Sequence, residues 1–162
     1  MSSSAGNEIL KVISTRFGEF DVNASSVITI PSGLIGFPGF SQFIILEYNQ
    51  PFSWLHSLER SDLAFVVVNA AEFGDGYIFD LPLGDSDTDL REEDDVAVIN
   101  LVSVRPAPQE TTVNLKAPVV VNLRNMRGRQ VVLDDHRFSM RFSLWAANEP
   151  QGEAKIAEPE KK

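Results

Sequence analysis

The sequence of 162 residues predicts an all-β or mostly β fold, in which antiparallel strands form a small barrel or a sandwich-like barrel with one short acidic helix. Apolar residues alternate with polar ones or gather in short β-branched runs, and Gly, Pro, Asn, Asp or Ser bounds each run. No window of about a dozen residues carries a helical stripe of apolar positions. The runs follow one another too closely for the helical crossovers that parallel strands need, so antiparallel strands are expected.

The strands are expected where these runs occur. In chain order they are residues 27–30, 43–48, 63–70, 96–104, 112–123 and 129–134. Two hairpins are predicted: RFGEF (16–20) turns at Gly18, and LRNMRGRQVVL (123–133) turns around residues 125–128. Pro118 interrupts one run, and because proline cannot donate to a ladder, its position is an edge strand, a bulge or a corner between sheets.

The short helix is expected at residues 86–93, SDTDLREE. Ser86 or Asp85 would cap it, and acids in its first turn favour the positive end of the helix dipole. The ends of the chain are polar and poor in apolar residues. We therefore expect a flexible N-terminus at residues 1–8, a single domain at 9–146 and a disordered polar tail at 147–162.

Charge is concentrated in one part of the chain. The net charge is −9, and the segment 72–95 carries all of it, because it holds ten acids against one base, Arg91, whereas the remaining 13 acids and 13 bases cancel. Direct binding to nucleic acid is disfavoured, since phosphate neutralisation needs clustered Lys and Arg. A localised acidic surface favours a basic protein partner instead.

The absence of cysteine from the sequence excludes disulfides, thiolate zinc sites and cysteine nucleophiles, and it fits a reducing compartment. The first ten residues have neither the basic start nor the apolar stretch of a secretory signal, and no run approaches the length of a membrane span. These features predict a cytoplasmic protein that does not enter the membrane.

Motifs that would indicate an enzyme or a metal site fail on inspection. DSDTD begins like a calcium loop, but Leu90 replaces the glycine and Val96 the bidentate glutamate that such a loop requires. His56 and His136 lie 80 residues apart and form no zinc motif. GLIGFPG lacks the lysine of a phosphate-binding loop.

The segment HSLERSD places Ser57 and Asp62 near His56, but adjacent residues of one strand point to opposite faces, so no catalytic triad is expected. The sequence therefore predicts a protein that is not an enzyme, with no catalytic residues, cofactor or metal.

Aromatic and polar residues in loops are the candidates for partner binding. Prolines and glycines give IPSGLIGFPGFSQF (30–43) a shaped turn, and its rings either enter the core or anchor a partner. Asn114 and Lys116 belong either to a half-solvated strand pair or to an interaction face. The candidate residues are Phe37, Phe40, Phe79, Asp85, Asp87, Asp89, Glu92, Glu93, Asn114 and Lys116.

Four blocks of sequence resemble the flagellar assembly factor FliW family. They are TRFGEFDV, ITIPSGLIGFPGFSQFIIL, PFSWLHSLERSDLAFVVVNA and TVNLKAPVVVNLRNMRGRQVVL, and they occur in the order and at the spacing of that family. The resemblance covers about residues 12–134. The later RFSMRFSLW and the polar tail inherit nothing from it.

The resemblance implies a small cytoplasmic β-barrel without catalysis that binds flagellin and, when free of flagellin, the RNA-binding translational regulator CsrA. Flagellin that accumulates in the cell would capture the protein, release CsrA and lower flagellin translation. The acidic segment 85–95 is expected near CsrA, because a negative surface close to its RNA-binding site repels RNA. The free protein is expected to be a monomer.

Two other readings stay open on the residues alone. Small barrels commonly hold small molecules in their mouths, so a small-molecule-binding or flavin-using β-barrel protein is the alternative function. A structural subunit is the third, which a large homo-oligomer would indicate.

Overall fold

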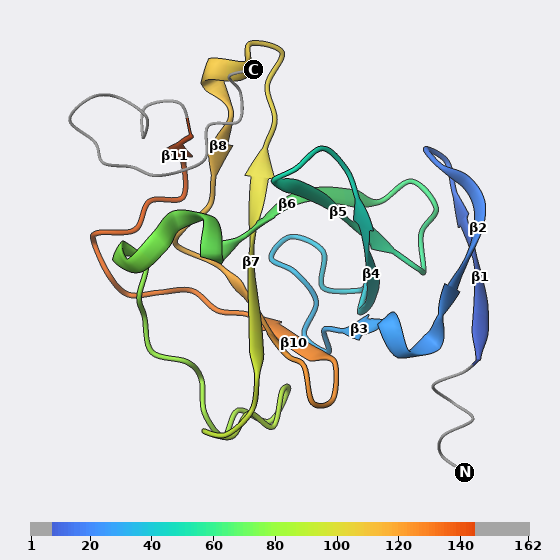
Figure 1. The fold of residues 1–162 in the computed structure, drawn as a ribbon, viewed down its shortest axis with the longest axis horizontal. Coiled ribbons are helices and arrows are strands. Elements are labelled where there is room, and N and C mark those ends of the chain that lie inside the picture. Colours follow the sequence, from blue (N-terminus) through green and yellow to red (C-terminus); the bar gives the residue numbers. More distant parts are fainter. Residues whose placement is uncertain (1–7, 145–162) are drawn as a thin grey trace.

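The computed structural model describes residues 8–144, and these residues form mostly β structure (Figure 1). The strands are β1 (Ile9–Ser14), β2 (Gly18–Asn23), β3 (Ile28–Thr29), β4 (Gln42–Glu47), β5 (Phe52–Ser57), β6 (Ala64–Asn69), β7 (Val96–Ser103), β8 (Thr112–Val113), β9 (Val119–Asn122), β10 (Arg127–Gln130) and β11 (Phe142–Ser143). Three short 3-10 segments join them: η1 (Ala24–Ser26), η2 (Ala70–Gly76) and η3 (Pro108–Glu110).

Seven strands close into a barrel. The strands β3, β4, β5, β6 and β7 pair in sequence order, β7 pairs with β9, β9 pairs with β10, and β10 returns to β3. This arrangement confirms the predicted fold class. The return is parallel, with Arg127 opposite Thr29 and the Thr29 N–H donating to Met126 O at 2.9 Å. The other pairs of the ring are antiparallel, so the prediction of antiparallel strands is wrong only at this closing pair.

Side chains from the strands fill the barrel interior. Its buried cluster contains Phe43 from β4, Leu55 from β5, Val67 from β6 and Val119 from β9, all at most 1% exposed. Leu34, from the loop after β3, joins the same cluster. Burial of each such side chain stabilises the fold by roughly 1.5–3 kcal/mol, so the interior is a packed core.

The hairpin of β1 and β2 is a separate two-stranded sheet, at the right of Figure 1. Its chain turns at residues 15–17, and Gly18 (φ 76°) begins β2, which confirms the predicted hairpin. The hairpin contacts the outside of the barrel through aromatic pairs: the Phe17 ring lies 5.8 Å from that of Trp54, and the Phe20 ring 6.4 Å from that of His56. It therefore covers the outer face of β5.

A second apolar core lies outside the barrel. It joins Val68 of β6 to β8, β11, the segment 131–138 and the chain that follows η2. Buried Asn100 donates from Nδ2 to Tyr77 Oη and to Asn114 O, both at 2.9 Å, and Tyr77 Oη donates to Leu115 O at 2.6 Å. Burial raises the pKa of Tyr77 to about 12. These bonds fix the segment after η2 against the barrel.

Pro118 directly precedes β9 and follows a bend at residues 116–117, within one sheet rather than at a corner between two. The ladder between β9 and β10 continues past Gln130, where the Val131 N–H donates to Pro118 O and the Leu133 N–H to Lys116 O. In both bonds the 131–133 segment is the donor and the 116–118 segment the acceptor. No bond runs in the other direction, because proline has no N–H and the Lys116 N–H donates to Asn114 Oδ1 instead. Residues 131–133 are therefore extended but paired on one side.

The prediction of a helix at residues 86–93 is wrong, because the structure has turns there. Asp85 does act as a cap, since its Oδ2 accepts from the N–H groups of Asp87 and Thr88 at 3.1 Å, but successive turns follow. Asp89 has φ 52°, a left-handed conformation that a right-handed helix cannot continue through. The helical segments with acidic residues are η2, which contains Glu72 and Asp75, and η3, which contains Glu110.

The predictions for the two ends fall largely outside the described part of the chain, which excludes residues 1–7 and 145–162. The exception is Glu8, whose carbonyl oxygen accepts from the Ala24 N–H at 2.8 Å. The domain limits 9–146 stay a prediction.

Candidate functional site

The loop 30–40 holds its aromatic rings against the barrel. Gly33 adopts φ +72°, and the Phe37 N–H donates to Leu34 O at 2.7 Å, so the backbone forms consecutive turns. The Phe37 ring meets the Phe65 ring edge to face at 5.1 Å, and Phe40 packs against the barrel core. Both rings are half-buried, and each keeps an exposed part.

The large aliphatic residue that this loop exposes is Ile35, which is 63% exposed. Sequence reasoning did not select it. The available signal was its place between buried Leu34 and Gly36, at the tip of a turn.

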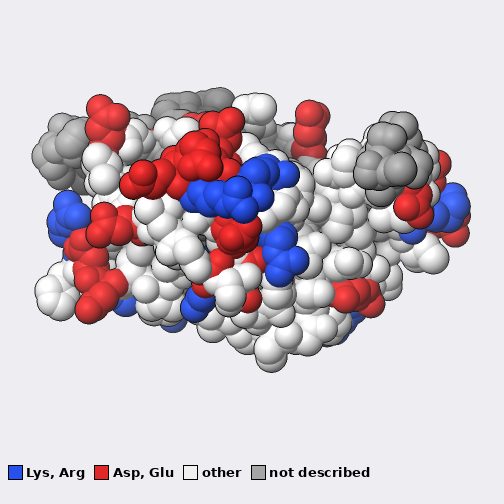
Figure 2. All heavy atoms as spheres, turned by 90° about the horizontal axis from the view of Figure 1, so that it is seen from below, with Lys and Arg blue, Asp and Glu red and all other residues white. Residues whose placement is uncertain are grey.

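Residues 85–95, which we call the acidic turn, lie against the β9–β10 hairpin (Figure 2). Arg129 pairs with Asp85, and the Arg127 Nε donates to Asp87 O at 2.7 Å. Arg124 bridges two acids, with contacts of 2.8 Å to Asp94 and 3.2 Å to Asp89. Figure 2 shows the resulting contact of red and blue side chains on the face seen from below.

Several carboxylates of the acidic turn serve the fold. The side chains of Asp85 and Asp94 are only 8% and 3% exposed, and Asp87 accepts a hydrogen bond from Ser32 of the 30–40 loop. The hydrogen bond from Arg124 lowers the pKa of Asp94 to about 2. These contacts attach the turn to the barrel and place it beside the aromatic loop.

The free charge of the acidic turn is smaller than the sequence suggests. Its seven acids and Arg91 sum to −6, and the three arginines of the adjacent hairpin, Arg124, Arg127 and Arg129, reduce this to −3. The exposed acids for which no ion pair with another described residue is found are Glu92, Glu93 and Asp95. The sequence could not show this, because the arginines lie some 30 to 45 residues further along the chain.

Asn114 and Lys116 act on nearby backbone. The Asn114 Oδ1 accepts from the N–H groups of Lys116 and Ala117 at 3.0 Å, and the Lys116 Nζ donates to Leu133 O at 2.9 Å. Both residues are half-buried and hold the chain as it approaches β9. Their place in an interaction face stays a prediction.

Phe79 and Glu92 are brought together by the fold. Both line a hollow with Leu81 and Leu83, and the Phe79 ring lies 5.2 Å from that of Tyr77 in the second core. Phe79 is half-buried, so it joins the apolar floor of a surface depression.

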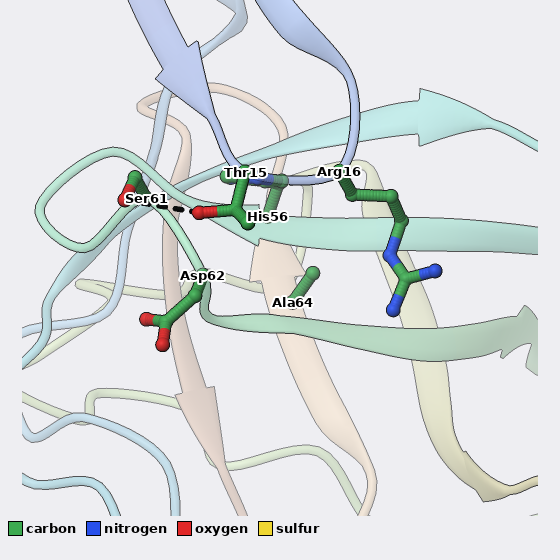
Figure 3. Close-up of a pocket in the computed structure, with 6 residues that line it drawn as sticks. All are labelled: Thr15, Arg16, His56, Ser61, Asp62 and Ala64. Atoms are coloured by element: carbon green, nitrogen blue, oxygen red, sulfur yellow. Dashed lines mark hydrogen bonds between the residues drawn. The ribbon is translucent and has the colours of Figure 1, made fainter.

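A further depression, of about 290 Å³, lies between the β1–β2 hairpin and the start of β6 (Figure 3). His56 lies beneath it with both ring nitrogens engaged, Nδ1 with Ser57 O at 2.7 Å and Nε2 with Ser14 Oγ at 2.8 Å. The Ser57 hydroxyl accepts from the N–H groups of Glu59 and Arg60, and Asp62 pairs with Arg60. His56, Ser57 and Asp62 therefore have separate partners and do not form a triad.

Within residues 8–144, no group of three or more acidic or histidine side chains is placed to hold a metal ion. No helix in the same range is long and apolar enough to cross a membrane.

Comparison with known proteins gives one consistent family. The model of the family described as FliW protein matches residues 11–144. The flagellar assembly factor FliW of Caldicellulosiruptor saccharolyticus is 38% identical over 136 residues, which span 83% of this chain and 90% of that protein. The same factor of Geotalea uraniireducens is 35% identical over 143 residues, or 86% and 87% of the two chains.

The fold agrees with this comparison. A crystal structure of the flagellar assembly factor FliW superposes with a TM-score of 0.72 at 27% identity, and the match covers 83% of this chain and 96% of that one.

Proposed function

This chain belongs to the FliW family of flagellar assembly factors, and on that premise we propose that it binds flagellin in the cytoplasm and antagonises the translational regulator CsrA. In this role the protein is a non-catalytic binding module, monomeric when free, that does not contact nucleic acid. Flagellin and CsrA compete for it, so accumulation of unexported flagellin releases CsrA and lowers flagellin synthesis.

Family membership over residues 11–144 is the observation that carries this proposal. The packed barrel interior is consistent with it, because a protein that works through its surface needs no internal site. The same packing gives no support to the alternative of a small molecule held inside the barrel.

The test is competitive co-purification of the full-length protein with purified flagellin and purified CsrA. Each partner alone should be retained, and increasing flagellin should displace CsrA. Retention of neither partner contradicts the proposal, and simultaneous retention of both contradicts the exchange.

We place CsrA at the exposed acids of the acidic turn. Glu92 and Glu93 are preferred over Asp85, Asp87 and Asp89, whose side chains contact Arg129, Ser32 and Arg124 within the fold. A negative surface there attracts a basic partner, and the attraction between exposed charges falls as salt rises.

The double substitution Glu92→Lys and Glu93→Lys should weaken CsrA binding at low salt and leave the melting temperature unchanged. The matched control is Glu19→Lys with Glu47→Lys, two exposed acids on β2 and β4. Equal CsrA affinity for both double variants at low salt would exclude this placement.

The exposed parts of Phe37 and Phe40, beside Ile35, form the proposed apolar contact of the same face. Because both rings also pack on the barrel, Ile35→Ser is the cleaner test. This substitution should reduce the affinity for a partner without a change in the free energy of unfolding. Unchanged affinity for both flagellin and CsrA would contradict the proposed contact.

A further inference from the structure

Two segments outside the strands bound a groove on the side of the molecule opposite the β1–β2 hairpin (Figure 1). One is the chain after η2, residues 78–83, and the other is residues 131–135, which follow β10. The space between them is about 510 Å³, and a neighbouring hollow extends it to Glu92. We call this the 78–135 groove.

The groove exposes large aliphatic side chains on a fixed floor. Ile78 is 66% exposed, Val132 61% and Leu83 50%, whereas Phe79 and Val131 beneath them pack against the second core. Contiguous exposed apolar residues with polar residues around them are typical of protein-binding sites.

The backbone of both segments is open to a further strand. The N–H and C=O groups of Ile78, Phe79, Asp80 and Val132 make no hydrogen bond to any residue in the described range. Residues 131 and 133 donate to the 116–118 segment, so the alternate residue, Val132, directs its polar groups to the other side. An extended chain with unpaired backbone groups is a template for strand addition.

The net charge around the groove is negative. Asp80, Asp134 and Glu92 are exposed, and no ion pair to another described residue is found for any of them. Asp135 is paired with Arg137 at 2.8 Å, so the lining carries a net charge of −3. This charge favours a segment with Lys or Arg and disfavours an acidic one.

We propose that the 78–135 groove binds an extended segment of a partner protein in which an aliphatic residue and a Lys or Arg stand two positions apart, because residues i and i+2 of a strand share a face, as Ile78 and Asp80 do here. The aliphatic residues contact Ile78, Leu83 and Val132, the basic residues face Asp80 and Asp134, and the backbone pairs with Val132. The inference deepens the proposed function and rests on it only in requiring a protein partner.

The probe is a fluorescently labelled nonapeptide, SVSKSVSKS, in which valine and lysine alternate on one face of the extended chain; we call it the Lys-Val peptide. Two control peptides change one property each: SSSKSSSKS keeps the charge without the apolar residues, and SVSESVSES reverses the charge. Binding to the full-length protein is measured by fluorescence anisotropy, and the contact is mapped by amide chemical-shift changes in NMR spectra.

The Lys-Val peptide should bind, shift the amides of residues 78–83 and 131–135, and bind about tenfold more tightly than either control. Ile78→Ser and Val132→Ser should each weaken it about tenfold, whereas Ile13→Ser, with the same 61% exposure as Val132, should leave it unchanged. Absence of Lys-Val binding, equal binding by the serine control, or shifts confined to other residues overturns the proposal.

Two other occupants would also overturn it. If Val132→Ser alone, without peptide, shifts the amides of residues 145–162, the groove holds the protein's own C-terminal segment. If the wild type is a dimer that Val132→Ser dissociates, the groove holds a second copy. These tests use only peptides and the isolated protein. A negative result would therefore overturn the groove proposal alone, and the competition between flagellin and CsrA would still be tested separately by co-purification.

Discussion

Gly33 shows how one residue shapes the loop that carries the aromatic rings. Its φ of +72° is a conformation that side chains with a Cβ rarely adopt, and a Cβ there would lie 2.7 Å from Phe37 O. Gly36, three residues later, has φ +91° but open space around it. A substitution at Gly36 therefore tests the backbone conformation alone, whereas one at Gly33 tests the conformation together with the close approach to Phe37 O.

Gly33→Ala should lower the free energy of unfolding by more than about 2 kcal/mol, because strain and a backbone clash add. Gly36→Ala should cost about 1–2 kcal/mol from the backbone conformation alone. Urea denaturation of both variants checks the difference, and equal losses would show that the close approach at Gly33 has no energetic effect.

Asp94 gives the stability a defined pH dependence. Its pKa lies at about 2, below the ordinary 3.8, because Arg124 donates to the ionised carboxylate. A lowered pKa in the folded state contributes stability that is present above the unfolded pKa and is lost as pH falls through the folded one. The window is therefore about pH 4 to 2.

The Asp94→Asn variant should have a lower urea midpoint than the wild type at pH 7. The difference between the two midpoints should decrease as the pH falls from 4 to 2. Unfolding curves at pH 7, 4, 3 and 2 test this. A difference in midpoint that stays constant over that pH range would mean that the Asp94 charge does not contribute to stability.

At the scale of elements, one hydroxyl contributes both to the turn of the β1–β2 hairpin and to its contact with β5. Ser14 Oγ accepts from the N–H groups of Arg16 and Phe17 and bonds to His56 Nε2 at 2.8 Å. The same group therefore forms the turn and joins the hairpin to β5. A removed partner leaves buried polar groups unsatisfied, which costs more than the bond itself.

Ser14→Ala should destabilise the protein by about 1–3 kcal/mol. Ser61→Ala, which removes an exposed hydroxyl contact of 3.3 Å to Thr15, should change stability by less than about 0.5 kcal/mol. Thermal and urea unfolding of the two variants provide the comparison, and a Ser14→Ala variant as stable as Ser61→Ala would show that water replaces the hydroxyl.

Elements with local signals were predictable from the sequence. The hairpin at Gly18 and the turn between β9 and β10 follow from turn residues between apolar runs. The prediction of a helix at 86–93 failed because Asp85 does act as a cap, but Asp89 is left-handed, and Arg124 of the β9–β10 hairpin contacts it there. Those contacts are non-local, and so is the barrel closure through the two-residue β3.

The sequence named candidate binding residues, which stay a prediction, but it did not show how they are arranged in space. The structure places the acidic turn beside the aromatic loop, joined by Ser32 and Asp87. Sequence reasoning could not tell that Asp85 and Asp94 are buried against arginines while Glu92 and Glu93 are exposed. It also missed Ile78 and Val132, because exposed aliphatic residues in extended segments look like core strand residues.

At the scale of the whole molecule, the parts are held with unequal strength. Each strand of the ring has a hydrogen-bonded neighbour on both sides, whereas the ladder of β1 and β2 joins only those two strands. Regions that open without disrupting a large core exchange their amide hydrogens at lower free-energy cost. The β1–β2 hairpin can open in this way, whereas the strands of the ring cannot separate without disrupting the barrel core.

Hydrogen exchange should therefore be faster for the amides bonded within β1–β2 than for those bonded between β6 and β7. Native-state exchange in low urea, followed by NMR, checks this. Identical exchange free energies for the two sets would show that hairpin and barrel unfold as one unit.

The parallel contact that completes the ring joins Thr29 to Arg127, near opposite ends of the domain. During translation, β3 leaves the ribosome long before its final neighbour has been made. The strands β3 to β7 cannot close into a ring until the last hairpin emerges, and long sequence separations of this kind slow folding. The finished barrel is thus reached only after nearly the whole domain has been synthesised.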